Sequence, residues 1–341
     1  MPDANFRDPL GLAWRMIRSG DATARSVLLR EGLGLATRPL DALLANREER
    51  RLRAADHEPG PTPCVLVVGG PRSGTTLVYQ LLAQHLHVSY TSNWTGAFPR
   101  SPISAGKLRP RWVREPKAST RNFFGSVAGP GGPNDAFAVW DRWFGEVRGK
   151  PGPLSPESAA EVRAFVSAWN AAFGRPLLNK NNRNALAITS LAEALPGATF
   201  VVVERDPVYV AQSLLEARAM VQGDARHGWG LLCEEADPAS AEGPVEAVCN
   251  QVRAFQREIG RQADALDPAR LVRVAYEAFC RDPLPVLHAV AAAGPAAGPV
   301  RGTPPPLRST DRRRIDVAAF AGIERRLGGS GRDRRRWAGD A

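Results

Sequence analysis

The sequence has little lysine, few cysteines and no long uncharged apolar run. Only four of its 45 basic residues are lysine, and its four cysteines stand singly, without the paired spacing of a zinc site or a redox motif. No segment approaches the ~20 apolar residues that cross a bilayer, and the first residues do not resemble a secretory signal. We therefore expect a cytoplasmic protein with reduced cysteines, no bound metal and no transmembrane segment.

The net charge of +10 is the second feature of the composition. The arginines are spread along the chain and are densest near its end, at residues 312–314 and 332–336. A dispersed excess of this kind argues against a nucleic-acid partner, which would require a basic stripe or patch. It favours an anionic small molecule or a glycan as partner, and it leaves peripheral contact with a membrane open.

One segment predicts an anion-binding turn. Residues 64–68 form a short apolar run that is typical of a buried strand, and Gly69, Gly70 and Gly74 follow it. The next residues predict a helix, whose first N–H groups lack partners within the helix and point toward the turn. Such a turn binds phosphate, although tight packing alone also explains a glycine-rich connection.

The turn lacks the lysine of nucleoside triphosphatases. The spacing from Gly69 to Gly74 fits the start of G-x-x-x-x-G-K-[ST], but Thr75 occupies the lysine position. The cation of the turn is instead Arg72, whose guanidinium can hold a terminal oxyanion. A phosphotransferase or nucleoside triphosphatase is therefore the disfavoured alternative. Three hydroxyl side chains stand beside this arginine: Ser73, Thr75 and Thr76.

A second strand-to-helix segment, residues 199–218, carries another candidate phosphate ligand. Its β-rich run ends at Arg205, and Asp206 is the expected N-cap of the helix that follows. Ser213 lies about two turns along that helix, so that its hydroxyl can reach the same anion as Arg205. The simpler alternatives are an ion pair of Arg205 with Asp206 or Glu204, and a packing position for Ser213.

The two segments together resemble the sulfotransferase family in its bacterial form. The run P-R-S-G-T-T-L is similar to the 5′-phosphosulfate loop of that family, and Arg205 with Ser213 is similar to its 3′-phosphate motif. The resemblance implies 3′-phosphoadenosine 5′-phosphosulfate (PAPS) as co-substrate and a hydroxyl of a carbohydrate, glycolipid or secondary metabolite as acceptor. An inactive module that binds the nucleotide or a glycan is a further alternative. The residues implied to hold PAPS are Arg72, Ser73, Gly74, Thr75, Thr76, Arg205 and Ser213.

The general base is not given by the resemblance. Bacterial relatives often carry a glutamate in the pattern W-E-x-x-x-P, whereas this chain has Thr95 after Trp94. Two carboxylates are candidates for the role: Asp135, expected in the first turn of a helix capped by Asn134, and Asp141, nearly two turns later.

The surroundings of Asp141 fit two accounts. Neighbouring tryptophans suit a ring-bearing acceptor such as a sugar. The other account is structural, with Asp141 paired to Arg142 or Arg148 over buried tryptophans.

Lys180 is the second candidate cation of the catalytic site. It follows the apolar run at residues 176–178 and resembles the second basic position of sulfotransferases, where it would steady the sulfonate. Asn181, Asn182 and Asn184 come next, as ligands or as turn and capping residues.

The order of apolar runs predicts an α/β fold, a three-layer sandwich around a mostly parallel sheet with a P-loop-like turn. We expect a helical N-terminal appendage over residues 1–56 and the α/β sulfotransferase domain over residues 57–293. A Pro-rich linker with a basic C-terminal segment, residues 294–341, should pack on that domain, where Arg312 or Arg313 can reach the 3′-phosphate unless the basic run is only solvated. The expected strands are residues 64–68, 88–91, 176–178, 200–203 and 271–275.

Overall fold

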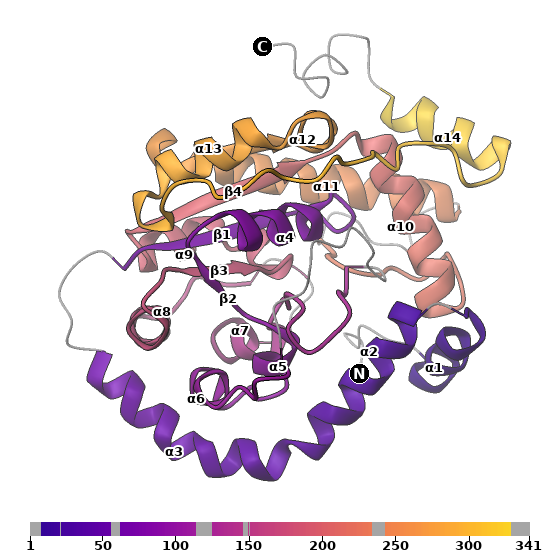
Figure 1. Cartoon of the computed structure of the whole chain (residues 1–341). Helices are drawn as coiled ribbons and strands as arrows, with labels where there is room; N and C mark the ends of the chain where they lie inside the picture. The colour runs from indigo at the N-terminus through magenta and orange to yellow at the C-terminus, as the bar shows by residue number, and fades with distance from the viewer. Residues whose placement is uncertain are drawn as a thin grey trace.

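The computed structural model describes residues 8–20, 22–55, 62–113, 125–145, 149, 151–233 and 243–328. In these residues, five parallel strands form one sheet in the order β2-β3-β1-β4-β5 (Figure 1). Each of the five expected runs overlaps a strand, and the predicted α/β class is confirmed. The strands are β1 Cys64–Gly69, β2 Ser89–Tyr90, β3 Leu177–Lys180, β4 Ala198–Glu204 and β5 Leu271–Ala275.

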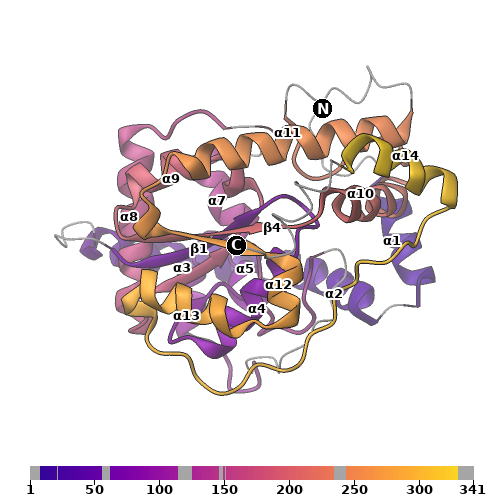
Figure 2. The same cartoon turned by 90° about the horizontal axis from the view of Figure 1, so that it is seen from above.

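Alternate side chains of the strands pack into two separate cores. In β1, Leu66 and Val68 belong to one buried cluster, while Val65 and Val67 belong to the other. Because successive side chains of a strand point to opposite faces, each face of the sheet is covered by its own helical layer. Figure 2 shows these layers: α8 Pro156–Phe173, α9 Ile188–Ala194 and α11 Pro244–Asp264 on one face, and α4 Thr75–His85 and α13 Leu284–Ala293 on the other.

The strand order brings the candidate residues to one edge of the sheet. From β1 the chain first adds strands on one side, β2 and β3, and later adds β4 and β5 on the other. Ligands of open α/β sheets bind at the carboxyl ends of strands where the order reverses in this way. The turn after β1, the asparagine-rich segment after β3 and Arg205 after β4 all lie at that edge.

The remaining elements are short connections and the peripheral helices. In the described residues they are α1 Pro9–Arg18, α2 Ala22–Ala36, α3 Arg38–Ala55, α5 Asn93–Gly96, α6 Pro102–Lys107, α7 Phe137–Phe144, α10 Pro207–Gln222, α12 Tyr276–Arg281 and α14 Val317–Leu327, with 3₁₀ turns at Arg183–Leu186, Pro268–Arg270 and Pro295–Ala297. Within the described part of the chain, none of these helices is long and apolar enough to traverse a bilayer.

Two buried acids fasten α3 to α6. Asp41 accepts hydrogen bonds from Ser101 Oγ at 2.6 Å and from the N–H of Arg100 at 3.1 Å. Glu48, only 1% exposed, accepts from the N–H groups of Ile103 at 2.9 Å and Ser104 at 2.7 Å. Ile103 and Ser104 belong to the first turn of α6, whose N-cap Ser101 does not cap the helix with its own side chain. Glu48 of α3 therefore caps α6 from outside, although burial raises its pKa.

The segment between α13 and α14 runs from the C-terminal end of α4 to the edge of the sheet that carries the candidate site. We call its residues 298–316 the C-terminal strap; Figures 1 and 2 show it passing α12 on its way to α14. It begins beside the end of α4, where the N–H of Arg301 donates to the carbonyl of His85 at 2.8 Å. It ends at α14, which packs on α10 through Phe320 and Tyr209, with ring centroids 6.1 Å apart. Residues 329–341, including the arginines at 332–336, lie outside the described residues.

Replacing Glu48 by alanine should lower the free energy of unfolding by about 3 kcal/mol, because two buried N–H groups lose their acceptor. The neighbouring variant Glu49→Ala is the matched control. Glu49 is exposed and pairs with Arg53, one turn away, so its loss should cost less than about 0.5 kcal/mol. Urea unfolding of both variants measures the difference, and equal costs would contradict the capping role of Glu48.

Candidate functional site

The turn after β1 is packed between two aromatic rings. A Cβ added at Gly70 would lie 2.1 Å from the ring of Phe255, and one added at Gly74 would lie 2.2 Å from the ring of Tyr276. Gly74 also has a φ of 96°, a backbone conformation that residues with a Cβ rarely adopt. Tight packing thus explains why both positions hold glycine, and it holds the turn in one shape.

Packing does not account for the open end of α4. Gly74 is the N-cap of α4 and provides no side-chain cap. Among the described residues, no acceptor binds the N–H groups of Gly74, Thr75 and Thr76. Three converging donors at the positive end of a helix dipole are suited to a phosphate or sulfonate oxygen.

Arg72 connects this turn to the second predicted motif. Its Nε donates to Ser213 Oγ at 2.9 Å, and its carbonyl accepts from Arg205 Nη1 at 3.0 Å. Burial, together with the nearby charges of Arg205 and Arg314, lowers the pKa of Arg72 to about 10. The guanidinium is therefore still cationic at neutral pH, next to the open end of α4.

Arg205 is almost completely buried, with an exposed fraction of 5%, and is ion-paired. Its partner is Asp311 of the C-terminal strap, rather than Asp206 or Glu204 as the simpler alternative had it. Asp206 instead caps α10 by accepting from the N–H of Val208 at 2.8 Å, as predicted. Glu204 pairs with Arg273 at 2.9 Å.

Lys180 and Asp135 form an ion pair near the start of α4. The distance from Nζ to Oδ2 is 2.7 Å, and the two side chains are 2% and 18% exposed. The hydroxyl of Thr76 donates to the carbonyl of Gly125 at 3.3 Å, and a Cβ added at Gly125 would lie 3.6 Å from that hydroxyl and 4.0 Å from Lys180 Nζ. The pair and the first turn of α4 therefore share one region.

The predicted helical setting of Asp135 is wrong. Helix α7 begins at Phe137, and Asp135 precedes it. Asn134 does not cap the helix, because its side chain accepts from the N–H of Ala136 at 2.7 Å and so forms a local turn. This turn frees Asp135 from the helix and directs it to Lys180.

Asp141 pairs with Arg183 rather than with Arg142, and Arg148 lies outside the described residues. Trp140 is buried in the core, with 2% of its surface exposed, and Trp143 packs against the ring of Phe165. Trp140 is thus unavailable to a sugar ring, as the structural account of this helix expected.

Several side-chain amide atoms in and after β3 are buried without a hydrogen-bond partner. In the described residues, Asn179 Oδ1, Asn181 Nδ2 and both amide atoms of Asn184 make no hydrogen bond, although each residue is only 1% exposed. Asn182, by contrast, accepts from Thr75 Oγ1 at 3.2 Å. Unpartnered buried amides are costly and usually indicate a bound ligand or water.

Thr95, at the position of the usual glutamate, has a structural role. Its hydroxyl accepts from the N–H of Ser92 at 2.8 Å, and Ser92 Oγ accepts from the N–H of Thr95 at 3.3 Å. This reciprocal capping box fixes α5. The structure thus gives no general base at this position.

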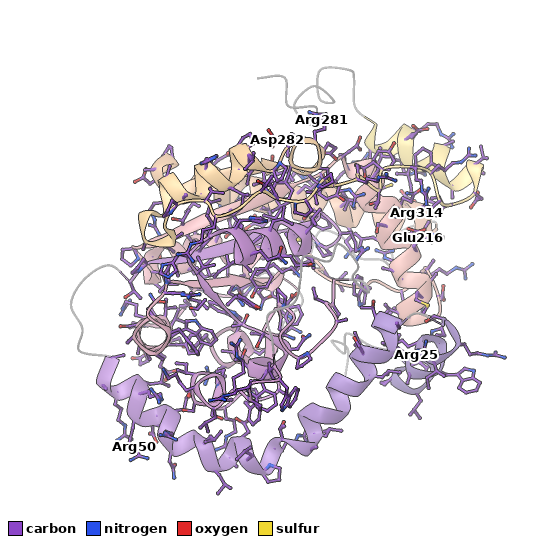
Figure 3. The ribbon with its side chains drawn as sticks, viewed as in Figure 1. Arg25, Arg50, Glu216, Arg281, Asp282 and Arg314 are labelled. Atoms are coloured by element: carbon purple, nitrogen blue, oxygen red, sulfur yellow. The ribbon has the colours of Figure 1, made fainter. Side chains whose placement is uncertain are left out.

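The partners of Arg205 and α10 in the strap were not predicted from the sequence. Gln212, fully buried, donates to the carbonyl of Arg312 at 2.9 Å and accepts from the N–H of Arg314 at 2.7 Å. Arg314 also pairs with Glu216 at 2.7 Å, as Figure 3 shows. The sequence signal that could have indicated these contacts is the row of polar residues 212, 213 and 216 on one side of the helix after Arg205. Arg312 and Arg313 themselves are exposed.

Comparisons with known proteins agree with this geometry. A family model described as "Sulfotransferase family" matches residues 63–293. The sulfotransferase STF1 of Mycobacterium tuberculosis is 14% identical, with 99% of this chain and 93% of that chain covered and a TM-score of 0.52. The sulfotransferase STF9 of Mycobacterium avium is 15% identical, with 91% and 79% covered and a TM-score of 0.52. At such identities the two structures are informative about the fold alone. The comparison with curated proteins finds no match.

The backbone of Arg72 gives a prediction about stability. Its φ of 69° lies in the left-handed region, where glycine is favoured over any residue with a Cβ. Arg72→Gly and Arg72→Ala both remove the guanidinium, but the glycine variant should be more stable by about 1 kcal/mol. Thermal unfolding of the two variants, side by side, measures this difference, and an alanine variant at least as stable would contradict a strained turn.

Proposed function

The chain belongs to the sulfotransferase family, and on that premise we propose that it transfers a sulfuryl group from PAPS to an acceptor hydroxyl. The acceptor would be a carbohydrate, a glycolipid or a secondary metabolite. The nucleotide would lie across the carboxyl edge of the sheet, with its 5′-phosphosulfate on the turn after β1 and its 3′-phosphate at Arg205 and Ser213.

The single observation that carries the proposal is the direct connection between the two phosphate motifs. Arg72 donates to Ser213, and Arg205 donates to the Arg72 carbonyl. Two segments that are more than 130 residues apart in the sequence thus bring two arginines together. The open N–H groups of α4 lie next to Arg72, and this arrangement suits a ligand with two separated anionic groups.

The chemistry follows from where the charges lie. The acceptor oxygen attacks sulfur, the bond from sulfur to the bridging phosphate oxygen breaks, and the hydroxyl proton passes to a base. Arg72 and the N–H groups of α4 would stabilise the charge on the transferring group and on the leaving phosphate. Lys180 would steady the sulfonate, and its partner Asp135 is the carboxylate that we assign as base.

Binding of 3′-phosphoadenosine 5′-phosphate (PAP) and ADP, measured by titration calorimetry without magnesium, tests the donor assignment. The wild-type protein should prefer PAP, because the 3′-phosphate is an additional ligand for Arg205. Arg205→Ala should weaken PAP binding about 30-fold, or ~2 kcal/mol, and leave ADP binding unchanged. Equal binding of PAP and ADP by the wild type would refute the proposal in favour of a nucleoside triphosphatase.

Arg273→Ala is the control for this variant. Arg273 is also an ion-paired arginine at the carboxyl half of a sheet strand, but its partners are Glu204 and Asp264. It should change PAP affinity less than about twofold, because its ion-pair partners are not among the residues proposed to bind the nucleotide. A loss as large as that of Arg205→Ala would show that the effect is a general one on charge or folding.

The base is tested by Asp135→Asn and Asp141→Asn at saturating PAPS, with an acceptor found by screening. The two are matched, because each removes one ion-paired carboxylate, and the two aspartate side chains have similar exposures of 18% and 15%. Asp135→Asn should lower kcat about 10²- to 10³-fold while PAP affinity is retained, whereas Asp141→Asn should stay within about fivefold of the wild type. Full transfer by Asp135→Asn would exclude Asp135 as the base.

A further inference from the structure

The C-terminal strap places a carboxylate at the subsite proposed for the 3′-phosphate. Asp311 Oδ1 accepts from Arg205 Nε at 3.0 Å and also from Arg205 Nη2. Arg205 Nη2 donates in addition to Thr310 Oγ1 at 3.2 Å, and Nη1 donates to the Arg72 carbonyl at 3.0 Å. Every nitrogen of this guanidinium is therefore already engaged by the protein.

The carboxylate is oriented by its own segment. Ser309 Oγ donates to Asp311 Oδ2 at 2.5 Å and accepts from the N–H of Asp311 at 3.1 Å. Gln212 holds the backbone of the strap immediately afterwards, at the carbonyl of Arg312 and the N–H of Arg314. Asp311 is thus held in place by Ser309 before it and by Gln212 after it, and its side chain is only 10% exposed.

A phosphate and Asp311 cannot share Arg205. Within the described residues, hydrogen bonds engage four of the five N–H groups of Arg205, and two like charges a few ångströms apart in a poorly solvated site repel each other strongly. A ligand phosphate must therefore displace the carboxylate. The 5′-phosphosulfate turn involves no such exchange, because its N–H groups at α4 are open.

We propose that Asp311 is an internal competitor for the 3′-phosphate and sets the affinity of the protein for the donor and its product. This inference rests on the proposed function. Binding of the donor would exchange the Arg205–Asp311 pair for an Arg205–phosphate pair and move residues 309–311 away from Arg205. The product nucleotide retains its 3′-phosphate, so the returning carboxylate would promote its release, a step that limits many enzymes.

The test is Asp311→Asn, which keeps the shape of the side chain and removes its charge. In titration calorimetry this variant should bind PAP about tenfold more tightly than the wild type, with ADP affinity unchanged. Product release, followed by stopped-flow displacement of PAP, should slow by a similar factor. Ser309→Ala, which frees one oxygen of the carboxylate, should shift PAP affinity in the same direction by a smaller factor.

Glu216→Gln is the matched control. It removes the same charge from another ion pair of the strap, that of Arg314, without touching Arg205. In Glu216→Gln, PAP affinity should change less than about twofold. If its affinity rises as much as that of Asp311→Asn, the gain in affinity comes from the change in net charge or from a loosened strap, and not from competition at Arg205.

Weaker or unchanged PAP binding by Asp311→Asn would contradict the proposal. If Asp311 instead positions Arg205 for the phosphate, Asp311→Asn will bind PAP more weakly, and an unchanged affinity would show that the two anions do not compete. Either outcome overturns the role of Asp311, provided that Asp311→Asn melts within a few degrees of the wild type. If the wild type still prefers PAP over ADP, the proposed function remains intact. A wild type without that preference counts against the proposed function itself. If Asp311→Asn does not fold, the response of Ser309→Ala decides between gain and loss of PAP affinity.

Discussion

The position of Arg72 is the constraint on which the rest of the site depends. The residue lies in the left-handed region between Gly70 and Gly74, and aromatic rings close over both glycines. This conformation directs the Arg72 carbonyl to Arg205 and the side chain to Ser213. A relaxed turn would separate Arg72 from Arg205 and Ser213, so the strain of the turn is offset by the contacts that it makes with the end of β4 and with α10.

The charges of the site follow from this arrangement. Arg72, Lys180 and Arg205 lie at one edge of the sheet, where burial makes an uncompensated cation costly. Lys180 is compensated by Asp135 and Arg205 by Asp311, both carboxylates from segments remote in the sequence. Arg72 is close to Arg205, and its pKa is lowered to about 10. Anions of a ligand would therefore enter a site whose cations are partly neutralised by carboxylates of the protein itself.

The part of the fold that could be predicted from the sequence is the part set by local pattern. The strands at residues 64–68 and 200–203 are apolar runs followed by turn and capping residues, so that their ends and the placement of Arg72 and Arg205 followed directly. Local pattern misplaced the start of α7, because Asn134 served equally well as a cap and as a turn residue, and only tertiary contact decides between them. Asp311 could not be predicted as a partner of Arg205, since 106 residues and an irregular connection separate them.

The missing glutamate of the bacterial pattern is explained by how two segments are joined. Thr95 belongs to the turn of α5, and next to this turn an isolated antiparallel bridge pairs Ser92 with Pro133. The N–H of Asn134 donates to the carbonyl of Thr91 at 2.8 Å, and Asn134 Nδ2 donates to Asn93 Oδ1 at 2.9 Å. Asp135, the next residue, is thereby brought beside the segment in which relatives carry their glutamate. A carboxylate supplied by the neighbouring segment can then serve the same edge of the sheet, while the threonine is left free to cap its own turn. For this reason the loss of the glutamate does not by itself argue for a protein that has lost catalysis.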